Sequence, residues 1–182
     1  MPDYEFVIAD PVTNREELIE LNVEYLSWVF QGIEAAFSIP ADQVVGMPAK
    51  TYVPAVIDKV CGDPPPKGIF YLVKIDGELA GMGGLRRLSD DTAEIKRIYF
   101  RPAFRGRRLG EIMLKRLLAD AVKFSYNRVC LDTGPFMSSA QRLYEANGFV
   151  ECNAYQGVEV PLEFHSRWRF MECKLQEQSS DV

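Results

Sequence analysis

The chain has 182 residues, of which 47% are apolar and 26% charged, and its formal net charge at pH 7 is −5. This length suffices for one domain with a sizeable core, and we expect a single domain over residues 1–176 followed by a short tail, residues 177–182. The acidic balance argues against a general nucleic-acid binder, and no apolar run reaches the length that a membrane span needs.

The first ten residues, MPDYEFVIAD, lack the basic flank and the apolar stretch of a signal peptide. Four cysteines are widely spaced and form no C-x-x-C pair, which favours reduced thiols over a disulfide framework or a zinc site. They are Cys61, Cys130, Cys152 and Cys173. We therefore expect a cytoplasmic protein without a bound metal.

The first part of the chain predicts a strand and two helices. A short strand at residues 4–10 precedes an amphipathic helix that Thr13 or Asn14 caps. A second helix covers residues 49–62, in which Pro54 marks the true start or a kink.

Three strands then form an antiparallel meander. The segments IFYLVKI (69–75) and ELAGMGGLRRL (78–88) flank an Asp76-Gly77 pair, which is typical of a hairpin with a primed turn. A second turn leads into TAEIKRIYF (92–100). The glycines of the middle strand indicate a bulge or a close backbone approach; they are Gly81, Gly83 and Gly84.

A strand–helix–strand unit follows the segment FRPAFRGRRLGEIML (100–114), and its last strand is RVCLDT (128–133). A crossover of this kind is right-handed and makes the two strands parallel. SSAQRLYEANGF (138–149) is a further helix with Ser138 or Ser139 as its cap, and two late strands close the sheet.

Positive charge is concentrated where the crossover helix begins. From Lys96 to Arg108 there are six basic residues and no acidic one. The N–H groups at the start of a helix have no intrahelical acceptor, and together with the helix dipole they favour an anion such as a pyrophosphate. Gly106 and Gly110 allow such a ligand to approach the backbone. The alternative is a solvated helix start whose arginines pair with surface acids.

The surrounding motifs resemble the GNAT family of N-acetyltransferases over residues 69–175. The family signature Q/R-x-x-G-x-G/A is matched at Arg105 and Gly110, with Arg108 in place of the middle glycine. The segment LYEANGF (143–149) is similar to the L-Y-x-x-x-G-F helix end of the family.

The resemblance implies a mixed α/β fold: a mostly antiparallel sheet with a parallel splayed strand pair and helices on both faces. It also implies acetyl-CoA as donor co-substrate, with no metal, and it allows a homodimer without requiring one. The implied acetyl-CoA site has a strand part for the pantetheine arm and a loop part for the pyrophosphate. The strand part is Ile98, Tyr99 and Phe100, and the loop part is Arg105, Gly106, Arg107, Arg108, Leu109 and Gly110.

Acetyl transfer to an amine needs a base for the amine proton, a donor for the developing oxyanion and a proton for the departing thiolate. The resemblance makes Glu94 the candidate base; the alternative is an ion pair with Lys96 or Arg97 on the sheet surface. It makes Tyr144 the candidate acid, and the alternative is a tyrosine that only fills the core.

Other polar residues have weaker signals. His165 is the only histidine and no serine or cysteine motif accompanies it, which argues against a Ser-His-Asp or Cys-His mechanism. Asp132 and Thr133 end the strand of the crossover unit, where they line the cleft or cap the next helix.

We therefore expect an N-acetyltransferase that moves an acetyl group to a primary amine of a small molecule or peptide by direct attack in a ternary complex. The acidic body favours a cationic amine, and we expect neither nucleic acid nor membrane as a partner. The alternative is a non-catalytic acyl-CoA-binding sensor or interaction domain on the same fold.

Overall fold

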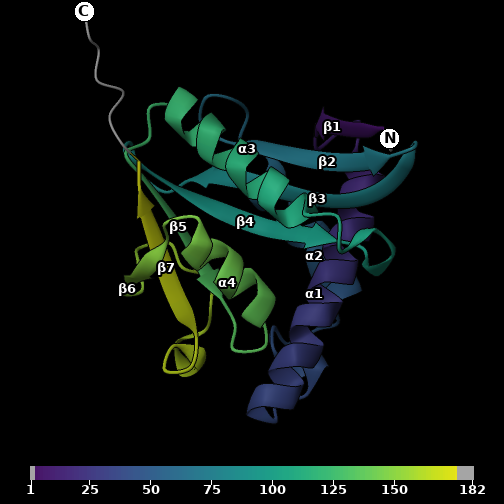
Figure 1. Ribbon diagram of the computed structural model, residues 1–182. Coiled ribbons are helices and arrows are strands. Elements are labelled where there is room, and N and C mark those ends of the chain that lie inside the picture. Colours follow the sequence, from purple (N-terminus) through teal and green to yellow (C-terminus); the bar gives the residue numbers. More distant parts are fainter. Residues whose placement is uncertain (1–2, 176–182) are drawn as a thin grey trace, which may run out of the picture.

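The computed structural model describes residues 3–175, so the predicted tail lies outside the described residues. Seven strands form one sheet in the order β1-β2-β3-β4-β5-β7-β6 (Figure 1). The strands are β1 (Tyr4–Ile8), β2 (Ile69–Ile75), β3 (Glu78–Arg87), β4 (Thr92–Phe100), β5 (Arg128–Thr133), β6 (Val150–Cys152) and β7 (Arg169–Lys174). The helices are α1 (Arg15–Phe37), α2 (Ala49–Cys61), α3 (Leu109–Lys123) and α4 (Ser138–Ala146).

One strand pair, β4 with β5, is parallel, and the other five pairs are antiparallel. The parallel pairing joins Thr92–Glu94 to Arg128–Cys130, and no later residue of β4 pairs with β5 in the part of the chain that the structure describes. The two strands therefore separate beyond Glu94 and leave a wedge between them. The predicted sheet, mostly antiparallel with one splayed parallel pair, is confirmed.

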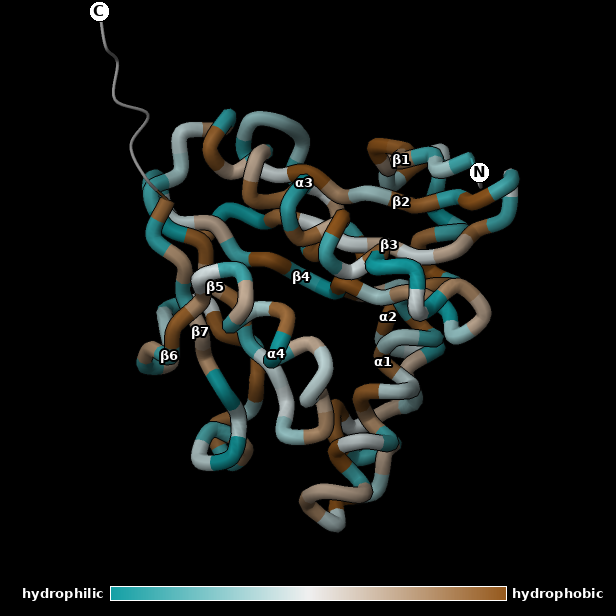
Figure 2. The backbone as a smooth tube through the Cα atoms, viewed as in Figure 1, coloured by the Kyte–Doolittle hydropathy of each residue, from teal (hydrophilic) through white to brown (hydrophobic). Residues whose placement is uncertain are grey.

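Helices cover both faces of the sheet, as predicted. The helices α3 and α4 pack on one face with apolar residues such as Met113 and Leu117, and α1 and α2 pack on the other with residues such as Leu21 and Ile57 (Figure 1). Apolar residues run through the central strands, as the brown stretches in Figure 2 show. The buried strands thus separate two cores, one on each face of the sheet.

The predicted hairpin turn is confirmed, since Asp76 and Gly77 have φ values of 50° and 83° and a primed turn requires positive values at both positions. At the start of α2 one of two open alternatives is excluded, and at the start of α4 the predicted cap is wrong. Helix α2 begins at Ala49 and runs through Pro54, so the proline does not mark its start. The N-cap of α4 is Met137, and neither serine after it makes a capping hydrogen bond, because both already lie inside the helix.

A bulge interrupts the pairing of β3 with β4, where the glycines predicted one. Met82 pairs with Tyr99 and Gly84 with Lys96, so Arg97 and Ile98 lie opposite a single residue of β3. Arg97 has a φ of 56°, a left-handed conformation that a bulge usually gives to glycine. The bulge lies just past the last parallel pair and therefore redirects β4 at the mouth of the wedge.

Residues 3–175 contain neither a membrane-spanning helix nor a cluster of metal ligands. No helix in this range is long and apolar enough to cross a membrane. No group of three or more His, Cys, Asp or Glu residues in it could hold a metal ion.

Candidate active site

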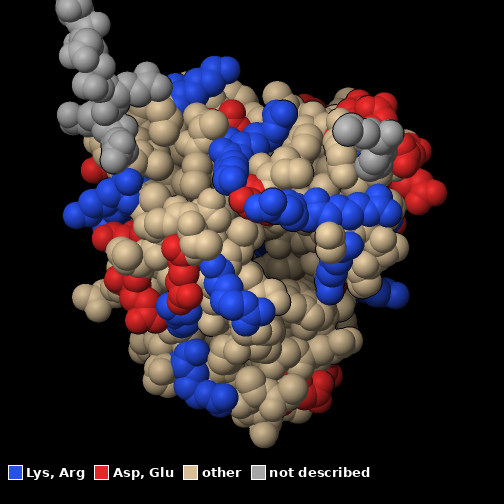
Figure 3. Space-filling view, in the orientation of Figure 1, with Lys and Arg blue, Asp and Glu red and all other residues tan. Residues whose placement is uncertain are grey.

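A groove of about 590 Å³ lies between the end of β4, the start of α3 and the first turns of α4. We call it the α3 groove. Eight of the nine residues predicted to bind the cofactor line it. They are Ile98, Tyr99, Phe100, Arg105, Gly106, Arg108, Leu109 and Gly110. Figure 3 shows a hollow in this face of the molecule, with Lys and Arg side chains gathered near its rim.

The backbone at the start of α3 offers hydrogen-bond donors to this groove. Within residues 3–175, no protein acceptor lies within hydrogen-bonding distance of the N–H groups of residues 106–111; the N–H of Ile112 is the first to find one, the Arg108 carbonyl at 3.1 Å. Gly106 and Arg108 are left-handed, with φ values of 81° and 58°. Alternating backbone conformations of this kind form concave nests of N–H groups that bind anions.

The arginine side chains of this segment are already engaged by the protein. Arg105 donates from Nε to the Phe100 carbonyl (2.9 Å). Arg108 donates to Glu111 (2.8 and 2.9 Å), and its side chain is 80% exposed. Arg107 does not line the groove, and its guanidinium lies over an aromatic ring of the preceding turn, 5.8 Å from the ring centroid. The hydrogen-bond donors that this segment leaves open to the groove are therefore mainly backbone N–H groups.

Tyr144, the predicted acid, lies in the same groove. It is 8% exposed, and no hydrogen bond from the described residues reaches its hydroxyl. Burial, with smaller contributions from Tyr25 and Asp132, raises the pKa of Tyr144 above its ordinary value. The phenol is therefore protonated at neutral pH, and a nearby thiolate could accept a hydrogen bond or a proton from it.

Glu94, the predicted base, is fully buried and does not line the groove. Its Oε2 lies 2.6 Å from Nη2 of Arg86, and its Oε1 accepts a hydrogen bond from the Tyr155 hydroxyl (2.8 Å). Lys96 is more distant, at 3.7 Å from Oε1. This is an ion-pair arrangement, the alternative that the sequence left open, but Arg86 makes the shortest contact rather than Lys96 or Arg97.

Glu159 extends this buried charge network. Its carboxylate is 2.9 Å from Lys59, 3.0 Å from Arg86 and 3.2 Å from Lys96. Burial alone would raise the pKa of Glu159, but Lys96 and the other two cations lower it to about 2. Three cations thus face the two carboxylates of Glu94 and Glu159.

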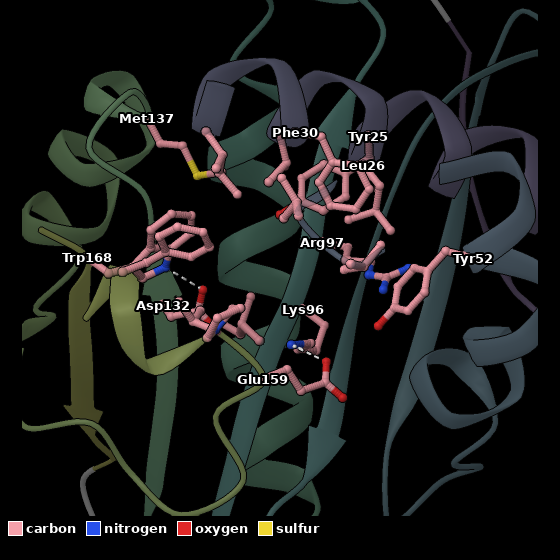
Figure 4. Close-up of a pocket in the computed structure, with 18 residues that line it drawn as sticks. Tyr25, Leu26, Phe30, Tyr52, Lys96, Arg97, Asp132, Met137, Glu159 and Trp168 are labelled. Carbon is pink, nitrogen blue, oxygen red and sulfur yellow. Dashed lines mark hydrogen bonds and ion pairs between the residues drawn. The ribbon is translucent and has the colours of Figure 1, made fainter. Parts of the chain in front are cut away.

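A second cavity, of about 130 Å³, lies beneath α1 on the other side of the wedge (Figure 4). We call it the α1 cavity. Its walls are mostly apolar and aromatic, with a few charged groups. The charged groups are Lys96, Arg97, Asp132 and Glu159. Met137 lines both the α1 cavity and the α3 groove, so the two spaces adjoin at the wedge.

Asp132, at the end of β5, lies near this junction. Its Oδ1 accepts a hydrogen bond from the indole N–H of Trp168 (2.9 Å, Figure 4), and no hydrogen bond from the described residues reaches its Oδ2. Its charge raises the pKa of both Tyr25, which lines the cavity, and Tyr144, which lines the groove. Of the two roles that the sequence left open, Asp132 lines the cleft and does not cap the next helix.

Two other residues considered from the sequence lie outside both spaces. His165 follows a short 3-10 turn, and its Nε2 is 2.8 Å from the Val160 carbonyl oxygen. Thr133 is buried, and no hydrogen bond from residues 3–175 reaches its hydroxyl.

Comparison with known proteins agrees with this arrangement. A model of the acetyltransferase (GNAT) family matches residues 33–149. An uncharacterized N-acetyltransferase of Escherichia coli, YjgM, is 32% identical over 104 residues, which are 52% of this chain and 62% of that protein. The chain spans less than two thirds of the length of the first curated relatives that it matches.

Solved structures share the fold over nearly the whole chain. A GNAT-family acetyltransferase from Staphylococcus aureus superimposes with a TM-score of 0.69 at 19% identity, covering 96% of this chain and 100% of that one. The PaiA N-acetyltransferase from Thermoplasma acidophilum, in complex with coenzyme A, gives a TM-score of 0.65 at 18% identity, covering 95% and 99%.

We predict that Gly110→Glu abolishes acetyl-CoA binding without unfolding the protein. A Cβ at Gly110 would meet only Leu143 Cδ2, at 3.4 Å, so the free protein accommodates a side chain. The added carboxylate would face the pyrophosphate, and we expect the Kd, measured by calorimetry, to rise at least about 100-fold. Gly110→Ala is the matched control and should keep the affinity. A folded Gly110→Glu protein with unchanged affinity would place the donor elsewhere.

We predict that Arg108→Gly is tolerated. Arg108 is left-handed and its side chain is largely exposed, so glycine should relieve strain and stabilise the fold by about 1 kcal/mol. Acetyl-CoA affinity should change by less than about fivefold, since the loss is one screened surface charge. Thermal unfolding and calorimetry measure the two effects; a much larger loss of affinity would assign the Arg108 side chain to a phosphate.

Proposed function

Because the chain belongs to the GNAT acetyltransferase family, we propose that it transfers an acetyl group from acetyl-CoA to a primary amine by direct attack in a ternary complex. One observation carries this proposal: the α3 groove and the α1 cavity adjoin at the wedge, with Met137 lining both. Two adjoining spaces can hold donor and acceptor together, and such proximity is what direct attack needs.

The donor would occupy the α3 groove. Its pyrophosphate would accept hydrogen bonds from the free N–H groups at the start of α3. Its pantetheine arm would run along Ile98–Phe100, a part of β4 that does not pair with β5. An extended arm can pair there with the backbone in the manner of an added strand. The thioester would then reach the wedge near Tyr144.

The acceptor amine would enter from the α1 cavity and lose a proton to a carboxylate. Asp132 is the base we propose, because it lines the cavity and its Oδ2 is free of hydrogen bonds from the described residues. Glu94 is the alternative. Both its oxygen atoms are engaged, so it would take a proton only through a group such as Tyr155, whose hydroxyl already donates to it.

Attack of the neutral amine on the thioester carbon would form a tetrahedral intermediate. Its collapse breaks the C–S bond and releases the CoA thiolate and the amide, and the surplus proton of the amide nitrogen replaces the proton that Tyr144 gives to the thiolate. Tyr144 would protonate that thiolate, consistent with its place in the groove and its protonated state.

The four free thiols of the chain fit the reducing conditions of the predicted cytoplasmic location.

The direct test is release of free thiol from acetyl-CoA across a panel of primary amines, together with the Kd of acetyl-CoA. Binding with amine-dependent thiol release supports the proposal. Tight binding without release in the presence of any amine would favour the non-catalytic acyl-CoA-binding sensor.

We predict that Tyr144→Phe binds acetyl-CoA normally and lowers kcat by about 100-fold. The ring still packs against Phe149, and only the hydroxyl that protonates the thiolate is lost. Steady-state kinetics and calorimetry measure both quantities. Tyr126→Phe is a control at a buried tyrosine outside the groove and should leave kcat unchanged. Equal turnover of Tyr144→Phe and the wild type would limit Tyr144 to packing.

We predict that the loss of rate depends on pH in Asp132→Asn and does not depend on pH in Glu94→Gln. Asp132→Asn should lose most rate at neutral pH, and its deficit should shrink by about tenfold per pH unit while the fraction of free amine is rising. Glu94→Gln should be destabilised by about 3 kcal/mol, because it breaks a buried ion pair, and any rate deficit should not vary with pH. The pH–rate profiles and unfolding curves of both variants show which carboxylate is the base. If the rate deficit depends on pH in Glu94→Gln and not in Asp132→Asn, Glu94 is the base.

A further inference from the structure

Arg97 occupies a backbone position that suits glycine, and its side chain lines the α1 cavity. It is one of the two bulge residues of β4, with a φ of 56°, a left-handed conformation that is unfavourable for an arginine. Figure 4 shows its guanidinium between α1 and Tyr52. A strained non-glycine residue in a cavity wall indicates that the side chain itself has a use.

The guanidinium has no carboxylate partner within residues 3–175. The protein group that it contacts is the neutral amide oxygen of Asn22, through Nη1. Its other nitrogen atoms make no hydrogen bond to the described residues. Unlike the Nε of Arg86, they are not fully buried. Donors of a planar cation are thus open to the cavity.

The neighbouring carboxylates do not balance this charge. Glu159 is already shared by Lys59, Arg86 and Lys96, and no ion pair within residues 3–175 joins Arg97 to Asp132, whose Oδ1 accepts a hydrogen bond from Trp168. Burial accordingly lowers the pKa of Arg97, although Tyr25 and other neighbours oppose the shift. Within the described residues, the cavity therefore contains a guanidinium that makes no ion pair and has hydrogen-bond donors for an anionic ligand.

We propose that Arg97 binds the carboxylate of the acceptor, so that the substrate is a small amino acid rather than a simple amine or a peptide. This inference rests on the proposed acetyl transfer. A guanidinium binds a carboxylate through two parallel hydrogen bonds, and Arg97 has donors to spare. The carboxylate would lie at Arg97 and the amino group towards Asp132, with the side chain against the apolar wall of the cavity.

The size of the cavity supports this class of ligand. A space of about 130 Å³ is close to the cavity that accepts benzene in an engineered protein, and it suits a ligand of a few heavy atoms. A peptide N-terminus would present a neutral amide where the amino acid presents its carboxylate, and would leave Arg97 without its anion.

The test compares each common amino acid with its amide and with the amine that remains after decarboxylation. For at least one amino acid we expect kcat/KM to exceed that of both analogues by about 10- to 100-fold, the range for hydrogen bonds to a charged group. Arg97→Gly should remove this preference, so that kcat/KM for the amino acid falls to that for its amide. Its melting temperature should rise, because glycine relieves the left-handed strain.

Arg97→Gln is the matched control for the charge. It keeps a long polar side chain and the strained backbone, so we expect the same loss of preference without the rise in melting temperature. Retention of the preference in both variants would overturn the proposal, because the carboxylate would then be bound elsewhere.

A binding measurement separates this inference from the proposed function. The melting temperature of the CoA-saturated protein, and of the free protein, is measured with each amino acid and its amide. A rise with an amino acid that Arg97→Gly loses supports the site even if no acetyl transfer occurs. Acetylation of amides and decarboxylated amines as fast as of amino acids overturns the carboxylate site and leaves acetyl transfer intact. The carboxylate site is also overturned if no amino acid shifts the melting temperature and none is acetylated.

Discussion

The separation of β4 from β5 is the constraint on which the rest of the structure depends. Their parallel pairing stops at Glu94 and Cys130, although β4 continues to Phe100. The unpaired edge of β4 leaves backbone groups that need partners. Both spaces of the candidate site open along this wedge, one bounded by α3 and α4 and the other by α1. A bound acyl-CoA arm would supply the missing pairing, so the break in the sheet and the binding site are one feature.

The bulge connects the two sides of the wedge. Ile98 packs with the core beneath α3, whereas the preceding residue, Arg97, lines the cavity beneath α1. Consecutive side chains of a strand point to opposite faces of the sheet, and β4 keeps its pairing with β3 on either side of the extra residue opposite Gly83. One short segment of backbone therefore contributes to both the α3 groove and the α1 cavity, the positions proposed for donor and acceptor.

Much of this arrangement was predictable because its causes are local in sequence. Turn residues, glycines and the crossover rule indicated the hairpin, the bulge and the parallel pair, and a helix start rich in glycine and arginine indicated the α3 groove. The environment of Glu94 was not predictable, because Arg86 and Tyr155 are eight and 61 residues away in sequence. Position along a strand identified Asp132 as a candidate, but only the contact with Trp168, 36 residues away, shows which oxygen atom stays open.

Charge acts differently at the surface and inside the protein. The net charge of −5 led us to expect a cationic amine. This charge attracts a cationic ligand through the solvent, and salt weakens the attraction. Inside the α1 cavity, screening is weaker and single groups dominate. Glu159, which lines this cavity, is paired with Lys96, Arg86 and Lys59, and the buried Glu94 beside it is paired with Arg86. Arg97 then faces Asp132 across a mostly apolar space, and a zwitterion fits these two charges better than a simple cation does.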